Sequence, residues 1–145
     1  MDQRPRRGFT LMEAAVVLAL AGTLAFMGAG SLLSLAPKYR LEAAVWEARA
    51  ALNRARYRAL HEGVSYRVRI LEDGLALDRH DPDAGAWIPA SRSLCEGARL
   101  SANNAPIFTP LGSVTGLATI TVGNGWGSYR LTLAITGRIK TTRIG

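Results

Sequence analysis

Glu13 is the side chain with the most unusual setting in this sequence. It stands inside an apolar segment, and the 24 residues that follow it, 14–37, carry no charge. A carboxylate in such a segment costs on the order of a few kcal/mol unless it is paired or reaches an interface. One interpretation is an acid in the first turn of a helix, stabilised by the macrodipole. The other is a charged partner. If the chain is cut after Gly8, Phe9 gains an amine that a neighbouring copy would bring to Glu13.

Cys95 is the single cysteine, so no disulfide forms within one chain. With His61 and His80 it provides too few ligands for a structural zinc site. A catalytic pair between Cys95 and a histidine stays open, but no neighbouring residue supports it. We expect Cys95 to be a partly buried residue of a strand.

Three carboxylates lie close together at Asp78, Asp81 and Asp83, and oxygens of this kind are ligands for Ca²⁺. The spacing of an EF-hand loop fails, because places that need further ligands hold Arg79 and Arg92. A metal in this loop therefore stays open, while no metal site or cofactor is predicted.

The sequence ends on a basic segment that contains Arg138, Lys140 and Arg143. In an extended strand, side chains two residues apart project to the same side at a spacing of about 7 Å. Arg138 and Lys140 would then suit adjacent backbone phosphates of DNA. No aromatic residue lies in this segment, so binding would be independent of sequence and sensitive to salt. The alternative is a solvated edge strand whose cations prevent aggregation.

The elements that position these residues begin with an apolar helix, predicted over residues 9–37. Its uncharged part would form about 36 Å of helix, and a bilayer core needs about 30 Å. Arg4, Arg6 and Arg7 precede it, and basic flanks stay on the cytoplasmic side. We expect one membrane-spanning helix with its amino end inside. The alternative is a secreted soluble protein with an ordinary signal peptide.

The helix is predicted to continue over residues 38–62 as an amphipathic segment. Pro37 predicts a bend, and Gly63 predicts a C-cap. The many arginines of this segment form either a solvated face or an electropositive surface for an acidic partner. Apolar residues recur at spacings of four and three, as on one face of a helix: Leu41, Val45, Ala48, Leu52, Ala55 and Ala59.

Residues 63–145 are predicted to form a small head of antiparallel strands. Apolar and polar residues alternate over 64–70, and after a turn at 72–74 the alternation resumes, which indicates a hairpin. Residues 81–106 are expected to be irregular, because Pro89 and Pro106 interrupt them.

A second hairpin is predicted from residues 117–122 and 128–135, which flank Asn124-Gly125. The glycine-rich residues 123–127 belong to this turn and do not form a phosphate-binding loop, since no Lys-Ser/Thr follows them. Residues 138–144 form either a last edge strand or a tail. Together these elements predict an α+β fold, in which the amphipathic helix packs on the antiparallel head.

The composition excludes an ordinary soluble enzyme read from end to end. The chain has 145 residues, and 18 Lys+Arg against 11 Asp+Glu give a net charge of +7. Hydrophobic residues make up 48% of the chain, but they are concentrated in its first quarter. No candidate active site is found, so the chain is not predicted to be an enzyme.

The amino-terminal motif resembles that of type IV prepilins and pseudopilins. In that family a short basic leader ends in Gly, and Phe-Thr-Leu, one further residue, Glu and a long apolar run follow. The matching residues are Gly8, Phe9, Thr10, Leu11 and Glu13. The resemblance implies that a prepilin peptidase removes residues 1–8 and methylates the Phe9 amine. The chain departs from many pilins at mid-helix, where it has Gly28-Ala29-Gly30 instead of a proline.

The head resembles minor pseudopilins and minor pilins of the GspH/FimT/FimU type. The Ala-Arg-rich helix end runs through Gly63 into a strand, as it does in that family. Phe108-Thr109-Pro110-Leu111-Gly112 resembles a Phe-x-Pro-x-Gly segment, and Thr136-Gly137-Arg138 resembles a terminal Thr-Gly-Arg stretch. A Gly-Arg-x-Arg-like tail is associated with DNA binding in some FimT-like members, and Lys140 stands here for the second arginine.

The resemblance implies a structural subunit of a type IV pilus, a type II secretion pseudopilus or a DNA-uptake filament. Its partners would be other pilins or pseudopilins, the prepilin peptidase and the inner membrane. The amino terminus would be cytoplasmic and the head periplasmic, until assembly places the subunit in a filament. The alternative is a DNA-binding minor pilin of a natural-transformation machine that uses its basic carboxyl-terminal edge.

Overall fold

The computed structural model describes residues 10–145, and of residues 28–33 it describes the backbone alone. One long helix, α1 (Leu11–Glu62), contains Pro37 within its length. The chain divides into two compact units between Ala36 and Pro37. The bend expected at Pro37 concerns the relation between these units, and it stays a prediction.

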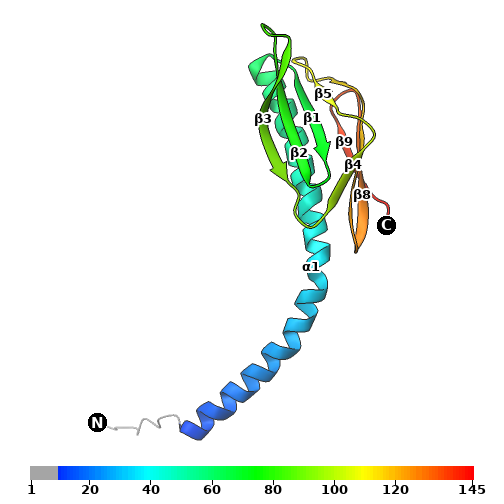
Figure 1. Cartoon of the computed structure of the whole chain (residues 1–145). Helices are drawn as coiled ribbons and strands as arrows, with labels where there is room; N and C mark the ends of the chain where they lie inside the picture. The colour runs from blue at the N-terminus through cyan, green and yellow to red at the C-terminus, as the bar shows by residue number, and fades with distance from the viewer. Residues whose placement is uncertain (1–9) are drawn as a thin grey trace, which may run out of the picture. The chain divides into compact units, whose positions relative to one another are not determined.

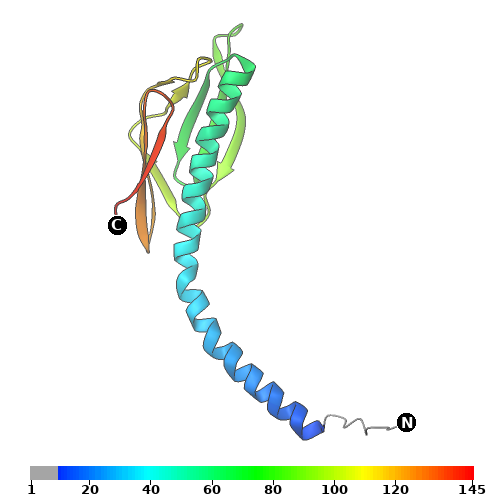
Figure 2. The same ribbon diagram turned by 180° about the vertical axis from the view of Figure 1, so that it is seen from behind.

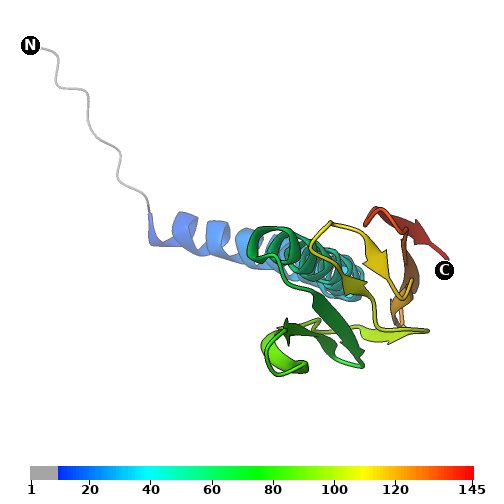
Figure 3. The same cartoon turned by 90° about the horizontal axis from the view of Figure 1, so that it is seen from above.

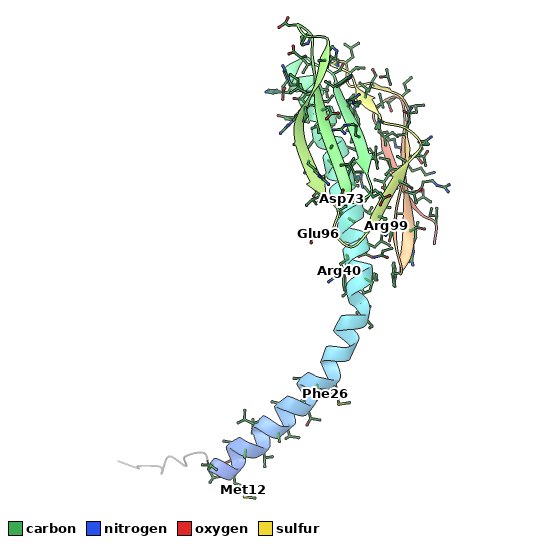
Figure 4. All side chains as sticks on the ribbon, viewed as in Figure 1. Met12, Phe26, Arg40, Asp73, Glu96 and Arg99 are labelled. Carbon is green, nitrogen blue, oxygen red and sulfur yellow. The ribbon has the colours of Figure 1, made fainter. Side chains whose placement is uncertain are left out.

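In the amino-terminal unit, every side chain described from residue 10 to residue 27 is exposed. Met12 and Phe26 lie on the helix surface without neighbours packed over them, 79% and 84% exposed (Figure 4). Within residues 10–145, with the side chains of 28–33 left out, no helical stretch is both long enough and apolar enough to cross a membrane.

In the head, the second part of α1 packs on the sheets through the stripe that the sequence predicts. All six of its predicted members are buried, and Ala44 and Ala51 join them. Most of these residues are alanines, whose small side chains let the sheets approach the helix closely. The predicted C-cap is also confirmed. Gly63 has φ 68° and donates its N–H to the carbonyl of Ala59 over 3.2 Å, as helix-ending glycines do.

The first sheet of the head has five antiparallel strands in the order β3-β2-β1-β5-β6. The predicted first hairpin is confirmed, because β1 and β2 pair from Tyr66↔Arg79 to Leu71↔Gly74. The strands are β1 (Tyr66–Leu71), β2 (Gly74–Asp81), β3 (Ala86–Leu94), β5 (Ile107–Phe108) and β6 (Val114–Thr115).

The expectation that residues 81–106 are irregular is wrong. Strand β3 pairs with β2 along its whole length, and residues 99–102 form β4 in the other sheet. Pro89 is tolerated because β3 lies at the sheet edge, where a missing N–H need not break a ladder. A bulge opposite Leu77 and Asp78 leaves Ala90 as the extra residue of β3.

The second sheet has four antiparallel strands in the order β4-β7-β8-β9. They are β4 (Arg99–Ala102), β7 (Thr119–Asn124), β8 (Gly127–Leu133) and β9 (Ile139–Arg143). The second predicted hairpin is confirmed, but Asn124 pairs with Gly127, so the turn consists of Gly125 and Trp126. Residues 139–143 form an edge strand, which is the first of the two alternatives.

The two sheets and the helix share one core in the head. Seen from the front and from behind, both sheets lie along the same segment of α1 (Figures 1 and 2), and the view from above shows them on different sides of that helix (Figure 3). The sheets contribute Phe108, Ile120 and Leu131, which are fully buried with Leu41 and Leu52 of the helix. The head is thus α+β, as expected, but it contains two sheets.

Candidate functional site

The start of α1 gives Glu13 a local role. Gly8 and Phe9, the predicted cleavage and methylation positions, lie outside the described residues. The hydroxyl of Thr10 accepts a hydrogen bond from the Glu13 N–H over 3.2 Å, so Thr10 is the N-cap and Glu13 is the third helical residue. Thr-x-x-Glu is the capping-box pattern. The exposed Glu13 carboxylate therefore stands where the helix dipole favours a negative charge.

The predicted basic residues of the carboxyl end separate in space. Strand alternation and register put Lys140 opposite Thr132 and put Thr142 opposite Arg130. Because residues directly opposite each other share a face, Lys140 and Arg130 lie on the face opposite to the buried Leu131 and Leu133. We call this the outer face of the second sheet.

Arg138 lies on the same outer face as Lys140, just before β9 begins. The N–H of Ala134 donates to the carbonyl of Arg138 over 2.9 Å, so Arg138 lies opposite Ala134, two residues beyond Thr132. Arg138, Lys140 and Arg130 are all exposed. The predicted common side of Arg138 and Lys140 thus agrees with the register. Arg130 joins them from the neighbouring strand, which the pattern of the tail alone does not indicate.

Arg143 takes a different position. Its guanidinium lies 4.3 Å from the centre of the Trp126 ring, and Lys38 lies 5.7 Å from the same ring. Its Nε donates to the carbonyl of Gly145 over 3.3 Å. Arg143 therefore fastens the chain end to the turn between β7 and β8, and it does not share the outer face with Lys140.

The strands that form the outer face carry charge of one sign. All eleven acidic residues lie at or before Glu96, so residues 97–145 contain five cations and no carboxylate. The remaining side chains of this face are mainly hydroxyls, among them Thr119, Thr121 and Thr132. A face whose own strands supply hydroxyls and cations and no acidic side chain has the chemistry to bind phosphate groups.

The carboxylates of Asp78 and Asp81 have different partners, and with Asp83 they do not converge on one point. Asp78 is 2% exposed and accepts two hydrogen bonds each from Arg67 and Arg69, at 2.7–3.2 Å. These bonds, those of Arg69 above all, hold the pKa of Asp78 below its usual value against the opposing effect of burial. Asp81 instead accepts the N–H of Asp83 over 3.0 Å. Across residues 10–145, no group of three or more His, Cys, Asp or Glu side chains is placed to hold a metal ion.

Cys95 has no histidine partner in the described part of the chain. It is 2% exposed, lies just after β3, and its Sγ contacts the carbonyl of Ala44 at 3.7 Å. Burial, reinforced by Glu47 and Asp73, raises the pKa of Cys95 to about 11, so the thiolate form that would act as a nucleophile is disfavoured. The histidine rings pack elsewhere, His61 on Tyr57 and His80 against Trp87.

The two short head motifs meet over the end of α1. Gly112 has φ 79° and Gly137 has φ 78°. A Cβ on Gly137 would lie 2.8 Å from Arg56 Nε and 3.0 Å from the carbonyl oxygen of Gly112, while one on Gly112 would lie 3.1 Å from Leu60. These glycines therefore let two loops close on the helix, which is a structural reason for both motifs.

No family model matches the chain, and no curated protein matches its sequence. Solved structures do match the fold. The type IV minor pilin FimU of Pseudomonas aeruginosa superposes with a TM-score of 0.60 at 19% identity, over 72% of this chain and 90% of that one. The minor pseudopilin EpsH of the Vibrio cholerae type 2 secretion system superposes with a TM-score of 0.54 at 18% identity, over 66% of this chain and 90% of that one.

The chain has the fold of the minor pilins and minor pseudopilins. This pilin-like fold confirms the predicted α+β class, with a long helix packed on an antiparallel head. A second structure of EpsH matches similarly, with a TM-score of 0.54 at 16% identity. The fold is therefore shared with a pilus subunit and with a secretion subunit.

Proposed function

We propose that the chain is a structural subunit, a minor pilin or minor pseudopilin, that assembles with other such subunits into a filament. The observation that carries the proposal is the combination of a pilin-like head with an amino-terminal helix whose apolar side chains are uncovered. An exposed apolar surface of this extent is typical of a segment that is covered by membrane or by partners. Nothing in the proposal requires catalysis.

The route to the filament follows from the leader. A prepilin peptidase removes residues 1–8 and methylates Phe9, and the subunit waits in the inner membrane with its head in the periplasm. Support comes from Arg4, Arg6 and Arg7 before the apolar run and from the uncharged residues 14–37. The machine is a type IV pilus, a type II secretion pseudopilus or a DNA-uptake filament.

Glu13 variants test assembly in the native cell. Glu13→Val should leave membrane insertion intact and strongly reduce recovery in sheared filaments, because an unpaired Phe9 amine in a low-dielectric core costs about 3–5 kcal/mol. Glu13→Gln is the decisive companion, since Gln retains the capping-box pattern but lacks the charge. If Glu13 pairs with a neighbour's amine, both variants are lost from filaments. Normal recovery of Glu13→Gln would reduce Glu13 to a helix-capping role.

DNA binding by the outer face of the second sheet is the second candidate function. It is favoured by the register, which joins Arg130 to Arg138 and Lys140, and by the lack of carboxylates after Glu96. Two of these cations lie about 7 Å apart along the strand, a spacing that suits adjacent phosphates.

The test compares cations on and off this face in the detergent-solubilised full chain. Binding of duplex DNA should weaken steeply with salt. Arg130→Ala with Lys140→Ala should lower both the affinity and the salt slope, by about 0.9 for each phosphate that the variant no longer neutralises. Arg143→Ala is the matched control, because that side chain packs on Trp126. No binding at low salt, or equal losses in all variants, would refute a site on this face.

A further inference from the structure

The head segment of α1 carries a second stripe that faces away from its core. On the side of the helix opposite to the buried stripe, a second set of residues recurs at spacings of four and three, and every member is exposed or half-buried. It consists of Tyr39, Ala43, Trp46, Ala50, Asn53, Tyr57 and Leu60. We call this set the outward stripe.

The outward stripe is unusually apolar for an exposed helix face. Tyr39, Trp46, Tyr57 and Leu60 are 58%, 69%, 67% and 50% exposed. On a helix that serves only to cover a head, such positions would hold charged or polar residues. Exposed aromatic residues in one line are instead typical of protein interfaces, where they are frequent anchors.

The spacing points to an α-helix as the occupant. A repeat of seven residues with alternating steps of four and three is the pattern of a coiled-coil seam. Large and small residues alternate over its first four members, so that Ala43 and Ala50 leave room on either side of Trp46. An open, shallow hollow of about 430 Å³ lies on the seam itself, lined by Ala50, Asn53 and Tyr57 of the stripe together with Arg54 and Arg58. Knobs of a partner helix would fill such holes.

The charges beside the seam decide what kind of helix fits. The flanking positions of the repeat hold Arg40, Glu47, Arg54 and His61 on one side and Glu42, Arg49 and Arg56 on the other. Glu47 is already bound to Arg54 over 2.6 Å, and Arg49 lies over the Trp46 ring at 5.9 Å. The border of the seam is therefore net positive.

This charge disfavours a second copy of the chain. Two copies packed through the same seam would bring arginines against arginines, and residues 38–145 as a whole hold fifteen Lys+Arg against nine Asp+Glu. A partner with carboxylates at its flanking positions would be attracted, because such positions set partner choice in coiled coils. The occupant is thus a different chain.

We propose that the outward stripe docks an amphipathic α-helix of another protein, whose apolar heptad seam is bordered by carboxylates. The inference goes beyond the proposed function, since it involves only residues 39–60 of α1. It does not depend on assembly through Phe9 and Glu13. Failure of the helix-docking proposal would therefore leave the filament-subunit proposal unaffected, and the reverse also holds.

The experiment uses the full chain in a mild non-ionic detergent and two synthetic helical peptides. Both peptides have the same leucine and alanine seam over three heptads, and they differ in having Glu or Lys at every flanking position. Binding of the dye-labelled peptides is followed by fluorescence anisotropy. The Glu peptide should bind at least tenfold more tightly than the Lys peptide.

Variants locate the binding on the stripe. Trp46→Ala with Tyr57→Ala should weaken binding of the Glu peptide at least tenfold. Both side chains are exposed, so circular dichroism and the unfolding midpoint should change little. Leu117→Ala is the matched control, because Leu117 is 51% exposed in the link between β6 and β7 and is not a member of the stripe. It should bind like the unaltered chain.

Three outcomes would overturn the proposal. They are failure of the Glu peptide to bind, equal binding of both peptides, and equal losses in Leu117→Ala and the stripe variant. Light scattering of the chain without peptide tests whether a second copy of the chain occupies the stripe instead. A doubled protein mass that returns to the monomer value in the stripe variant would also overturn the proposal, because the occupant would then be a second copy. The filament assay with Glu13 variants is independent of each of these results.

Discussion

The side-chain amide of Asn124 donates a hydrogen bond to the backbone carbonyl of Pro37 over 2.8 Å and another to the carbonyl of Gly97 over 3.0 Å. Its Oδ1 accepts the N–H of Trp126 over 2.9 Å. One side chain thus ties the turn between β7 and β8 to the first residue of the head helix and to the link between the sheets. Lys38 over the Trp126 ring adds a second contact at the same place.

Asn124→Ala should destabilise the head by about 1–2 kcal/mol, because three hydrogen bonds are removed at a partly exposed site. Denaturant unfolding followed by tryptophan fluorescence measures this change. Asn53→Ala is the control, since Asn53 is exposed on the helix and alanine is the better helix former. An unchanged midpoint in Asn124→Ala would show that these bonds contribute nothing net.

Asp78 should make the head sensitive to acid. Its pKa is lowered in the folded state, so its contribution to stability is present above the unfolded pKa near 3.8 and is lost as pH falls through the folded value. Asp78→Asn should destabilise the head at pH 7 by about 1–2 kcal/mol, since it removes the charge from the hydrogen bonds of Arg67 and Arg69, whose guanidinium groups stay partly solvated. The difference between the two proteins should shrink between pH 5 and pH 2, measured by urea midpoints. A constant difference over that range would contradict this role.

Cys95 should be inert in the folded protein. Its pKa of about 11 and its burial predict that iodoacetamide at pH 8 labels it only after unfolding. Because the folded pKa is raised, the linked stability is present below the unfolded pKa near 9 and declines as pH rises toward 11. Cys95→Ala should lose less stability than the unaltered chain over that interval. Rapid labelling of the native chain would show that the thiol is accessible.

Gly137 should not tolerate a side chain. Gly137→Ala requires φ near 78° and places a Cβ against Arg56 and the Gly112 carbonyl, so a loss of at least about 1 kcal/mol is expected. Gly125→Ala is the matched control, because its Cβ meets nothing within 4 Å and its φ is not in the left-handed region. Thermal unfolding of both variants separates the effect of this site from a general effect of glycine loss.

Processing should leave a chain that starts at Phe9. Loss of residues 1–8 from the 145 leaves 137 residues, and methylation adds one methyl group to the new amine. Intact mass measurement of the protein extracted from membranes of its own host decides this. A start near residue 37 would instead indicate ordinary signal cleavage and would contradict the subunit proposal.

Local patterns in the sequence determined the elements that need only their own residues. The stripe from Leu41 to Ala59 predicts the buried helix face, since spacing along a helix fixes which side chains share a side. The two hairpins follow from alternation on both sides of a turn. The position of Glu13 in an apolar segment also follows from neighbouring residues alone. The same holds for the shared strand face of Arg138 and Lys140, which are two residues apart.

Tertiary structure decided what depends on pairing between distant segments. Strand β3 is mostly exposed along its length, so it shows no alternation, and only its pairing with β2 makes it a strand. The pairing of β1 with β2 likewise turns Asp78 from a candidate metal ligand into the partner of Arg67 and Arg69. A sequence pattern cannot report such pairs, because they form between residues that are neighbours only after folding.

The basic face illustrates the same division within one site. The sequence places Arg143 beside Lys140, but the register sends Lys140 outward with Arg130 and leaves Arg143 on Trp126. Side chains alternate between faces, so a shift of one residue moves a cation to the opposite side of the sheet. The sequence by itself determined which charges the carboxyl end carries, and the strand pairing decided which of them act together.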